Sequence, residues 1–216
     1  MRKGFIFDLD GVITDTAKYH YIAWKQLADE LGITIDLAFN EQLKGISRMD
    51  SLERILQHGK KETDYSIEEK EAFAEKKNTH YVTLLQELTP ADLLPGVESF
   101  LQEATEKNIP CAIASASKNA PFILGKLGIK ERFSIIVDPN TLAKGKPDPE
   151  IFLRAAEALA IQPNEAVGFE DAQAGIQAIK SAGMYAVGIE TQEALEGADR
   201  VIKQLDELSI EELLLV

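Results

Sequence analysis

The sequence has 216 residues, of which 45% are hydrophobic, and its 23 basic and 36 acidic residues give a formal charge of −13. This length suits one enzyme with an appended module, and so acidic a surface without a basic stripe excludes nucleic acid as a partner. We find no secretory leader and no apolar run of about 18 residues, so we expect no membrane partner. Cys111 is the single cysteine, which excludes internal disulfides and indicates the reducing cytoplasm. We also expect a monomer.

Short apolar runs of the kind that form buried strands recur along the chain. They lie at residues 3–10, 110–115, 133–138, 166–171, 185–190 and, more weakly, 199–203. Between most of them, apolar residues recur at helical spacing over residues 97–107, 120–128, 148–160 and 172–183, and Gly128 and Gly183 mark two helix ends. This alternation predicts an α/β fold with a doubly wound, Rossmann-like parallel sheet that binds ligands at the carboxyl ends of its strands.

Residues 17–88 interrupt the alternation. Three amphipathic helices are predicted here, over residues 19–32, 47–59 and 68–88, with no strand between them. The chain returns through "TPADLLPG", residues 89–96, where two prolines and a glycine break regular structure. The pattern predicts a helical domain, residues 17–88, inserted into an α/β core made of residues 1–16 and 89–216.

Two acids, Asp8 and Asp10, follow the first apolar run. Positions i and i+2 of a strand share a face, so the two carboxylates would repel each other unless a cation lay between them. Oxygen ligands without a histidine or cysteine favour Mg²⁺. The alternative is a pair of acids solvated in a loop.

Polar residues also end three other predicted strands. Ser115 ends the second, Lys146 follows the third, and Glu170 and Asp171 end the fourth. In a parallel sheet all of these residues reach the edge that carries Asp8. Asp171 has an alternative interpretation as the N-cap of the following helix.

Two stretches of the sequence favour the binding of an anion. In the first, Ser47 and Asp50 form a capping-box pattern that opens a helix beside Arg48. The second precedes a helix with Pro121 in its first turn and contains Ser117, Lys118 and Asn119. The alternative for Arg48 is an ordinary surface arginine beside a helix cap.

Thr16, His20 and Trp24 are spaced by four, which places them on one helix face after the acid pair. A structural histidine and a core tryptophan are the alternatives for the last two. By composition alone, Lys77 is one of several lysines on a polar face.

Together, "DLDGVITDT", Ser115, Lys146 in "KGKPDP" and "GFEDAQAG" resemble the haloacid dehalogenase superfamily of phosphotransferases. The resemblance implies that Asp8 is the nucleophile that becomes an aspartyl phosphate and that Asp10 is the general acid and base. It also implies a core with an inserted helical cap and one Mg²⁺ per active site. The residues that it assigns to the metal are Asp8, Asp10, Glu170 and Asp171.

The sequence resembles one branch of that superfamily, the sugar-phosphate mutases, in "LKGISR" and "KKN" of the helical region and in "ASASKNAPF" of the core. This resemblance implies interconversion of beta-glucose 1-phosphate and glucose 6-phosphate, with glucose 1,6-bisphosphate as intermediate and activator. It places Thr16 at a hinge, gives His20 and Lys77 the task of orienting Asp10 and the closed cap, and assigns the reacting phosphate to Ser115 and Lys146. The substrate-binding residues that it implies are Trp24, Gly45, Ile46, Ser47, Arg48, Ser51, Lys77, Ala116, Ser117, Lys118 and Asn119.

One residue departs from the branch's pattern, because Met49 stands where an acid is expected after Arg48. Two other functions stay open at this point. A small-molecule phosphatase on the same scaffold would transfer the phosphoryl group to water, and a noncatalytic protein would only bind Mg²⁺ and a sugar phosphate.

Overall fold

The computed structural model describes residues 1–43, 46–190 and 194–216. They form two compact units, which we call the core unit, Met1–Asp15 with Leu88–Val216, and the cap unit, Thr16–Glu87. Each boundary lies one residue from its position in the sequence-based division. Among the described helices, none has both the length and the apolar character needed to cross a membrane.

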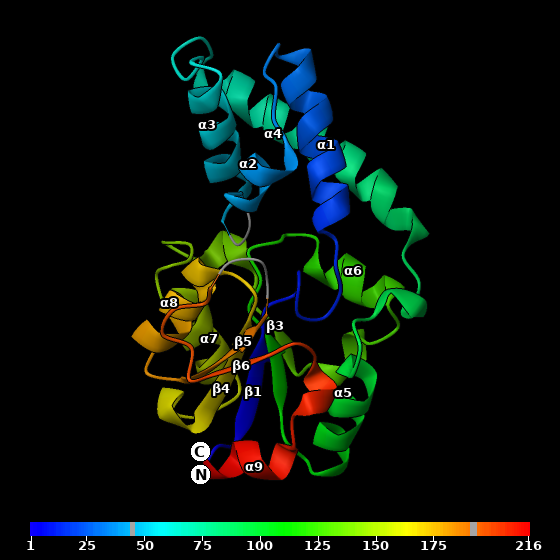
Figure 1. Ribbon diagram of the computed structural model, residues 1–216, viewed down its shortest axis with the longest axis vertical. Coiled ribbons are helices and arrows are strands. Elements are labelled where there is room, and N and C mark those ends of the chain that lie inside the picture. The colour runs from blue at the N-terminus through cyan, green and yellow to red at the C-terminus, as the bar shows by residue number, and fades with distance from the viewer. Residues whose placement is uncertain (44–45, 191–193) are drawn as a thin grey trace. The chain divides into compact units, whose positions relative to one another are not determined.

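The core unit is built on a parallel sheet in the order β3-β2-β1-β4-β5-β6 (Figure 1). Its strands are β1 (Gly4–Phe7), β2 (Cys111–Ile113), β3 (Ile135–Ile136), β4 (Ala166–Glu170), β5 (Tyr185–Ile189) and β6 (Arg200–Ile202). Each of the six strands lies inside an apolar run from which a strand was predicted, so the predicted α/β class is confirmed. β1 pairs with both β2 and β4, which brings three of the predicted site segments together.

Helices follow most of the strands of the core unit. They are α5 (Val97–Glu106), α6 (Ala120–Lys126), α7 (Glu150–Ala158), α8 (Gln173–Ser181) and the C-terminal α9 (Ile210–Leu215). Gly128 and Gly183 follow the ends of α6 and α8 with φ angles of 74° and 78°. Since only glycine enters this left-handed region without steric cost, these residues end the helices where the sequence predicted.

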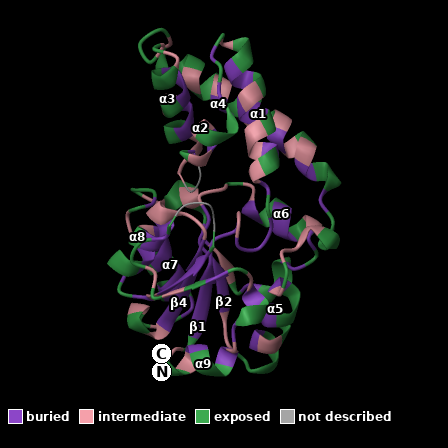
Figure 2. Ribbon diagram, in the orientation of Figure 1, coloured by how far each residue is buried: buried purple, intermediate pink, exposed green. Residues whose placement is uncertain are grey.

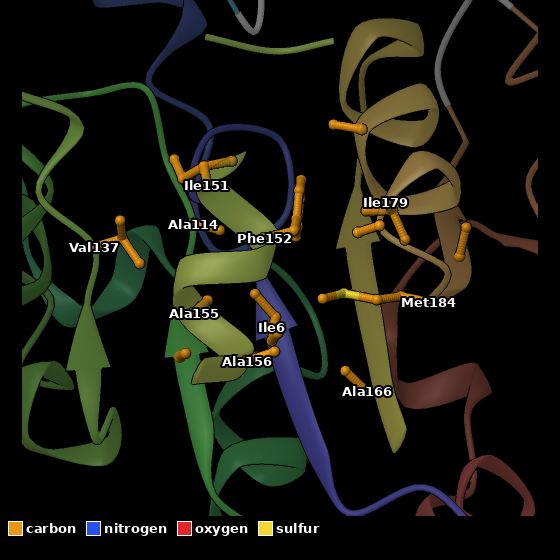
Figure 3. Close-up of a cluster of buried hydrophobic side chains, with 14 of the residues drawn as sticks. Ile6, Ala114, Val137, Ile151, Phe152, Ala155, Ala156, Ala166, Ile179 and Met184 are labelled. Carbon is orange, nitrogen blue, oxygen red and sulfur yellow. The ribbon is translucent and has the colours of Figure 1, made fainter. Parts of the chain in front are cut away.

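The two faces of β1 pack against different helices. Ile6 lies under α7, where Figure 3 shows Ile151, Phe152 and Ala155 over the strand. The flanking Phe5 and Phe7 face the other side and belong to a cluster of aromatic rings that includes Phe100 of α5. Figure 2 shows the central strands as buried. This two-sided burial explains why the strand reads as a continuous apolar run.

The cap unit contains α1 (Ala17–Glu30), α2 (Leu37–Glu41), α3 (Arg48–His58) and α4 (Ile67–Leu84). Its helices enclose a hydrophobic cluster that includes Trp24, Leu52 and Ile55. The sequence predicted α1, α3 and α4 but missed α2, which is too short to show a helical period. Its start is fixed by Asp36, whose carboxylate accepts a hydrogen bond of 2.8 Å from the N–H of Phe39.

Candidate active site

The acid pair lies where β1 gives way to a turn. Asp8 continues the strand ladder, because its N–H donates to a β4 carbonyl at 2.9 Å, although β1 itself ends at Phe7. Beyond it, the N–H groups of residues 12–14 converge on the carbonyl oxygen of Leu9 at 2.9–3.4 Å. The expectation that one extended strand runs through both Asp8 and Asp10 is therefore wrong, because β1 ends at Phe7. Asp10 lies beyond the strand and forms an isolated β-bridge with Thr14.

Lys146 forms a buried ion cluster with two carboxylates. Its Nζ lies 2.6 Å from Oδ1 of Asp8 and 2.7 Å from Oε2 of Glu170. None of the three side chains is more than 7% exposed. The ammonium also lies 5.1 Å from the ring centroid of Phe152 on α7. The parallel pairing of β1 with β4 brings these carboxylates to one edge of the sheet.

Opposing effects set the pKa values in this cluster. Burial favours the neutral amine of Lys146, but the charges and hydrogen bonds of Asp8 and Glu170 outweigh burial and raise the pKa of Lys146. Burial and the charge of Asp8 raise the pKa of Glu170 well above its usual value, and Lys146 opposes this shift. Lys146 is thus held as an ammonium ion beside Asp8, where it favours a negatively charged ligand.

The loop that carries Lys146 is tied to the helix that follows it. One carboxylate oxygen of Glu150, the first residue of α7, accepts hydrogen bonds from the N–H groups of Ala143 and Lys144 at 2.8 and 3.1 Å. The N–H of Glu150 in turn donates to Asp148 at 3.0 Å. These bonds fix the path of the loop on both sides of Lys146.

Three carboxylates gather at the ends of β1 and β4. One oxygen atom each from Asp8, Glu170 and Asp171 lies within 4.8 Å of the other two. The N-cap of α8 is Ala172, so the interpretation of Asp171 as a helix cap is wrong. Asp10, which the sequence placed among the metal ligands, is not a member of this group.

The donor set of this group fits a magnesium ion. All three donors are carboxylate oxygens, which hard divalent cations prefer. The ammonium of Lys146 pairs with Asp8 and Glu170. A divalent cation would add positive charge to this group of three carboxylates, whose burial is costly without compensating charge.

Ser115 follows β2, the strand next to β1. The N–H of Ala114 donates to the carbonyl of Phe7 at 2.7 Å, so β2 and β1 run together as far as these two site residues. After Ser115 the loop is held by hydrogen bonds from its backbone N–H groups to its own serine hydroxyl groups. Oγ of Ser115 accepts from the N–H of Ser117 at 3.1 Å, and Oγ of Ser117 accepts from the N–H of Asn119 at 3.3 Å. Lys118 is exposed and Ala116 is half-buried.

In the cap unit, α3 begins where the sequence predicted. Ser47 is its N-cap and accepts a hydrogen bond of 3.1 Å from the N–H of Asp50. Arg48 is half-buried and donates to Oδ1 of Asn78 at 2.8 Å, with Glu75 at 3.3 Å. Burial lowers the pKa of Arg48, against the opposing charge of Glu75. The arginine therefore belongs to a polar network with α4.

The other predicted residues of this segment differ in accessibility. Ser51 is 3% exposed, and its hydroxyl donates to the carbonyl of Ser47 at 3.0 Å. Ile46 is half-buried, and Met49 is exposed. Gly45 lies outside the described residues.

A second buried polar group joins α1 and α4. Nζ of Lys77 lies 2.8 Å from Nδ1 of His20, and the lysine is only 3% exposed. The ammonium also lies 4.6 and 4.5 Å from the ring centroids of Trp24 and Tyr81. The interpretation of Lys77 as a surface residue is wrong, whereas Trp24 does lie in the hydrophobic cluster of the cap unit.

The sequence reasoning did not select Tyr81 or Asn78. Tyr81 is fully buried, and its hydroxyl lies 3.0 Å from that of Thr16, at the start of α1. Its position four residues after Lys77 on a predicted helix was an available signal, because such residues share a face. Asn78 ends the "KKN" stretch, but its partner Arg48 lies on another helix, so the sequence assigned no role to it.

The pKa of His20 is lowered well below 6.5, first by burial and then by the charges of Lys77 and Arg48. Since an ammonium can only donate, Nδ1 of His20 is the acceptor and the ring proton lies on Nε2. A neutral His20 thus completes the hydrogen bonding of Lys77.

This shift predicts that the cap unit loses stability in mild acid. Below about pH 6.5 the unfolded state binds a proton that folded His20 resists, so the free energy of unfolding should fall by roughly 1 kcal/mol for the first pH unit. Trp24 is the only tryptophan and lies in the cap unit, so its fluorescence during urea unfolding reports this change. We expect His20→Gln to reduce the pH dependence and the exposed His58→Gln to preserve it. Equal slopes for the two variants would contradict the assignment.

Comparison with known proteins now identifies the family. The family model for haloacid dehalogenase-like hydrolases matches residues 2–183. The beta-phosphoglucomutase of Bacillus subtilis (strain 168) is 52% identical over 209 residues, which cover 97% of this chain and 92% of that protein. A crystal structure of beta-phosphoglucomutase from Clostridium difficile is 50% identical, with a TM-score of 0.95 and coverage of 99% of this chain and 96% of that one.

A more distant relative has a different activity. The fructose-1-phosphate phosphatase YqaB of Escherichia coli (strain K12) is 31% identical over 189 residues, which cover 86% of this chain and 95% of that protein. These matches confirm the superfamily predicted from the motifs around Asp8, Ser115, Lys146 and Glu170, and this chain belongs to the haloacid dehalogenase-like hydrolase family.

Proposed function

We propose that this protein acts as a beta-phosphoglucomutase, which interconverts beta-glucose 1-phosphate and glucose 6-phosphate. The observation that carries the proposal is the buried contact of Asp8 with Lys146, beside Glu170 and at the ends of adjacent strands. A carboxylate held next to an ammonium is suited to attack phosphorus, because the cation offsets the charge of the approaching phosphoryl oxygens. The likeness to the Bacillus subtilis enzyme over 97% of the chain supports the choice of substrate.

The reaction that we propose has two half-steps of the same kind. An oxygen of Asp8 forms a bond to phosphorus while the bond from phosphorus to a sugar oxygen breaks, and Asp10 gives a proton to that leaving oxygen. In the reverse sense, Asp10 removes the proton from a sugar hydroxyl, which then takes the phosphoryl group from Asp8. Starting from the bisphosphate and alternating between the 1- and 6-oxygens gives net isomerisation with no consumption of water.

The other core residues have positioning and charge-balancing roles in this scheme. Lys146 and Ser115 would donate hydrogen bonds to oxygens of the phosphoryl group in transfer. Asp8, Glu170 and Asp171 would hold a magnesium ion, and Asp10 is proposed to complete the site from the segment that follows β1. When bound, this ion supplies additional positive charge to the phosphoryl oxygens.

We propose that the remaining polar residues recognise the second phosphate. On the cap unit these are Ser47 and Arg48, whose guanidinium presents several donors beside a helix start. On the core unit the 115–119 loop supplies Ser117, Lys118 and Asn119. Thr16 is proposed to act at the junction of the units, and His20 with Lys77 to support the reactive state of Asp10. A monomeric state and a cytoplasmic location stay predictions.

An isomerisation assay tests this function against a phosphatase on the same scaffold. With Mg²⁺, beta-glucose 1-phosphate and a trace of glucose 1,6-bisphosphate, we expect glucose 6-phosphate to form much faster than inorganic phosphate. Removal of Mg²⁺ by EDTA should stop the reaction, and the alpha anomer should serve as the matched control. Release of phosphate as the main product would favour the phosphatase, and binding of the sugar phosphate without either product would favour a noncatalytic protein.

A further inference from the structure

Helix α8 contains a glycine that its backbone conformation does not require. Gly175 is the third residue of this helix, and its φ angle lies outside the left-handed region that requires glycine. Glycine at such a position weakens a helix relative to alanine, because it loses more conformational freedom on folding. Another constraint must therefore account for the absence of a side chain.

The constraint is contact with Glu170. A β-carbon built on Gly175 would lie 2.0 Å from both Cδ and Oε2 of Glu170, and 2.3 Å from its Cγ. These separations are far below van der Waals contact, so either the helix or the glutamate would have to move.

Glu170 has little freedom to yield. Its side chain is fully buried, and Oε2 accepts a hydrogen bond of 2.7 Å from Lys146. The other oxygen, Oε1, lies 3.4 Å from the N–H of Ala172 at the start of α8. The carboxylate is thus held between the lysine on one side and the helix backbone on the other.

We propose that Gly175 is a positioning residue, which lets the Glu170 carboxylate lie against the α8 backbone at the distance needed by Lys146 and by the magnesium ion. The inference rests on the magnesium site proposed above. Gly11 makes a similar approach, with a β-carbon position 2.1 Å from Oδ2 of Asp171, but its φ angle of 75° already requires glycine. A substitution at Gly175 therefore tests the collision with Glu170 alone, without added strain in the backbone.

The test compares two alanine substitutions in helices. A β-carbon on Gly175 collides with Glu170, whereas one on Gly125, in α6, meets no atom within 4 Å. Calorimetric titration with MgCl₂ should give a dissociation constant about 10- to 100-fold higher for Gly175→Ala than for the unmodified protein. Gly125→Ala should leave that constant unchanged. Equal Mg²⁺ affinity in the unmodified protein and Gly175→Ala would overturn the positioning role.

A second pair of variants separates positioning from loss of folding. Gly168→Ala places its β-carbon 2.7 Å from the apolar side chain of Ile179, so it should lower the melting temperature while Mg²⁺ affinity is preserved. In the Glu170→Ala background, the three glutamate atoms that collide with the new methyl group are absent, so Gly175→Ala should there cause a smaller further loss of Mg²⁺ affinity. An equal loss in both backgrounds would overturn the contact as the cause. Absence of Mg²⁺ binding in the unmodified protein would instead overturn the proposed metal site, and this inference with it.

Discussion

Asp8→Asn is expected to lower isomerisation by at least about 10⁴-fold, because an amide of the same shape cannot attack phosphorus. It should also abolish the covalent phosphoenzyme that we propose the unmodified protein forms with glucose 1,6-bisphosphate. Intact-protein mass spectrometry after rapid acid quenching would measure the added phosphoryl group, and a coupled assay would measure glucose 6-phosphate. The fold should survive, since Lys146 keeps its contact with Glu170.

Asp10→Asn is the matched control for this experiment. It changes the neighbouring acid in the same way but leaves the proposed nucleophile in place. We expect it to slow transfer to and from sugar severely, because proton transfer by a positioned group contributes about 10²- to 10⁴-fold. A phosphoryl group trapped on Asp8→Asn would refute the nucleophile assignment, and unimpaired turnover of Asp10→Asn would refute the acid–base assignment.

The sheet was predictable because its strands are buried on both faces. Phe5, Ile6 and Phe7 are all fully buried, so the sequence of this strand is a continuous apolar run, which distinguishes it from the amphipathic helices that follow. Parallel pairing then places the polar residues that follow these strands on one edge, which is why Ser115 and Glu170 could be grouped with Asp8 before any coordinates.

The errors arose where local sequence does not determine the path of the chain. β1 ends at Phe7, and the turn that follows Asp10 depends on hydrogen bonds to the carbonyl of Leu9, which no periodicity indicates. Lys77 looks like a surface lysine because its burial depends on His20, on a different helix. Gly175 resembles an ordinary helix glycine until the position of the Glu170 side chain is known.

Lys146→Met should destabilise the core unit more than any exposed lysine substitution. The thioether side chain has a similar volume but leaves the buried carboxylates of Asp8 and Glu170 without their ammonium partner. Removing one member of a buried ion pair costs about 3–5 kcal/mol, and proton uptake by Glu170 would offset part of this loss. Urea unfolding followed by far-ultraviolet circular dichroism, without Mg²⁺, would measure the change in the free energy of unfolding.

Mg²⁺ should restore part of this stability in Lys146→Met, because a bound cation would compensate the same carboxylates. Isomerisation should remain low by about 10²- to 10³-fold even with Mg²⁺, since the donor to the phosphoryl oxygens is missing. Lys180→Met is the control, because Lys180 lies 2.7 Å from Asp199 but the lysine side chain is 40% exposed, and solvent screens the pair. An equal loss of stability in both variants would show that the buried cluster does not depend on the charge of Lys146. Full activity of Lys146→Met would exclude the lysine from phosphoryl transfer.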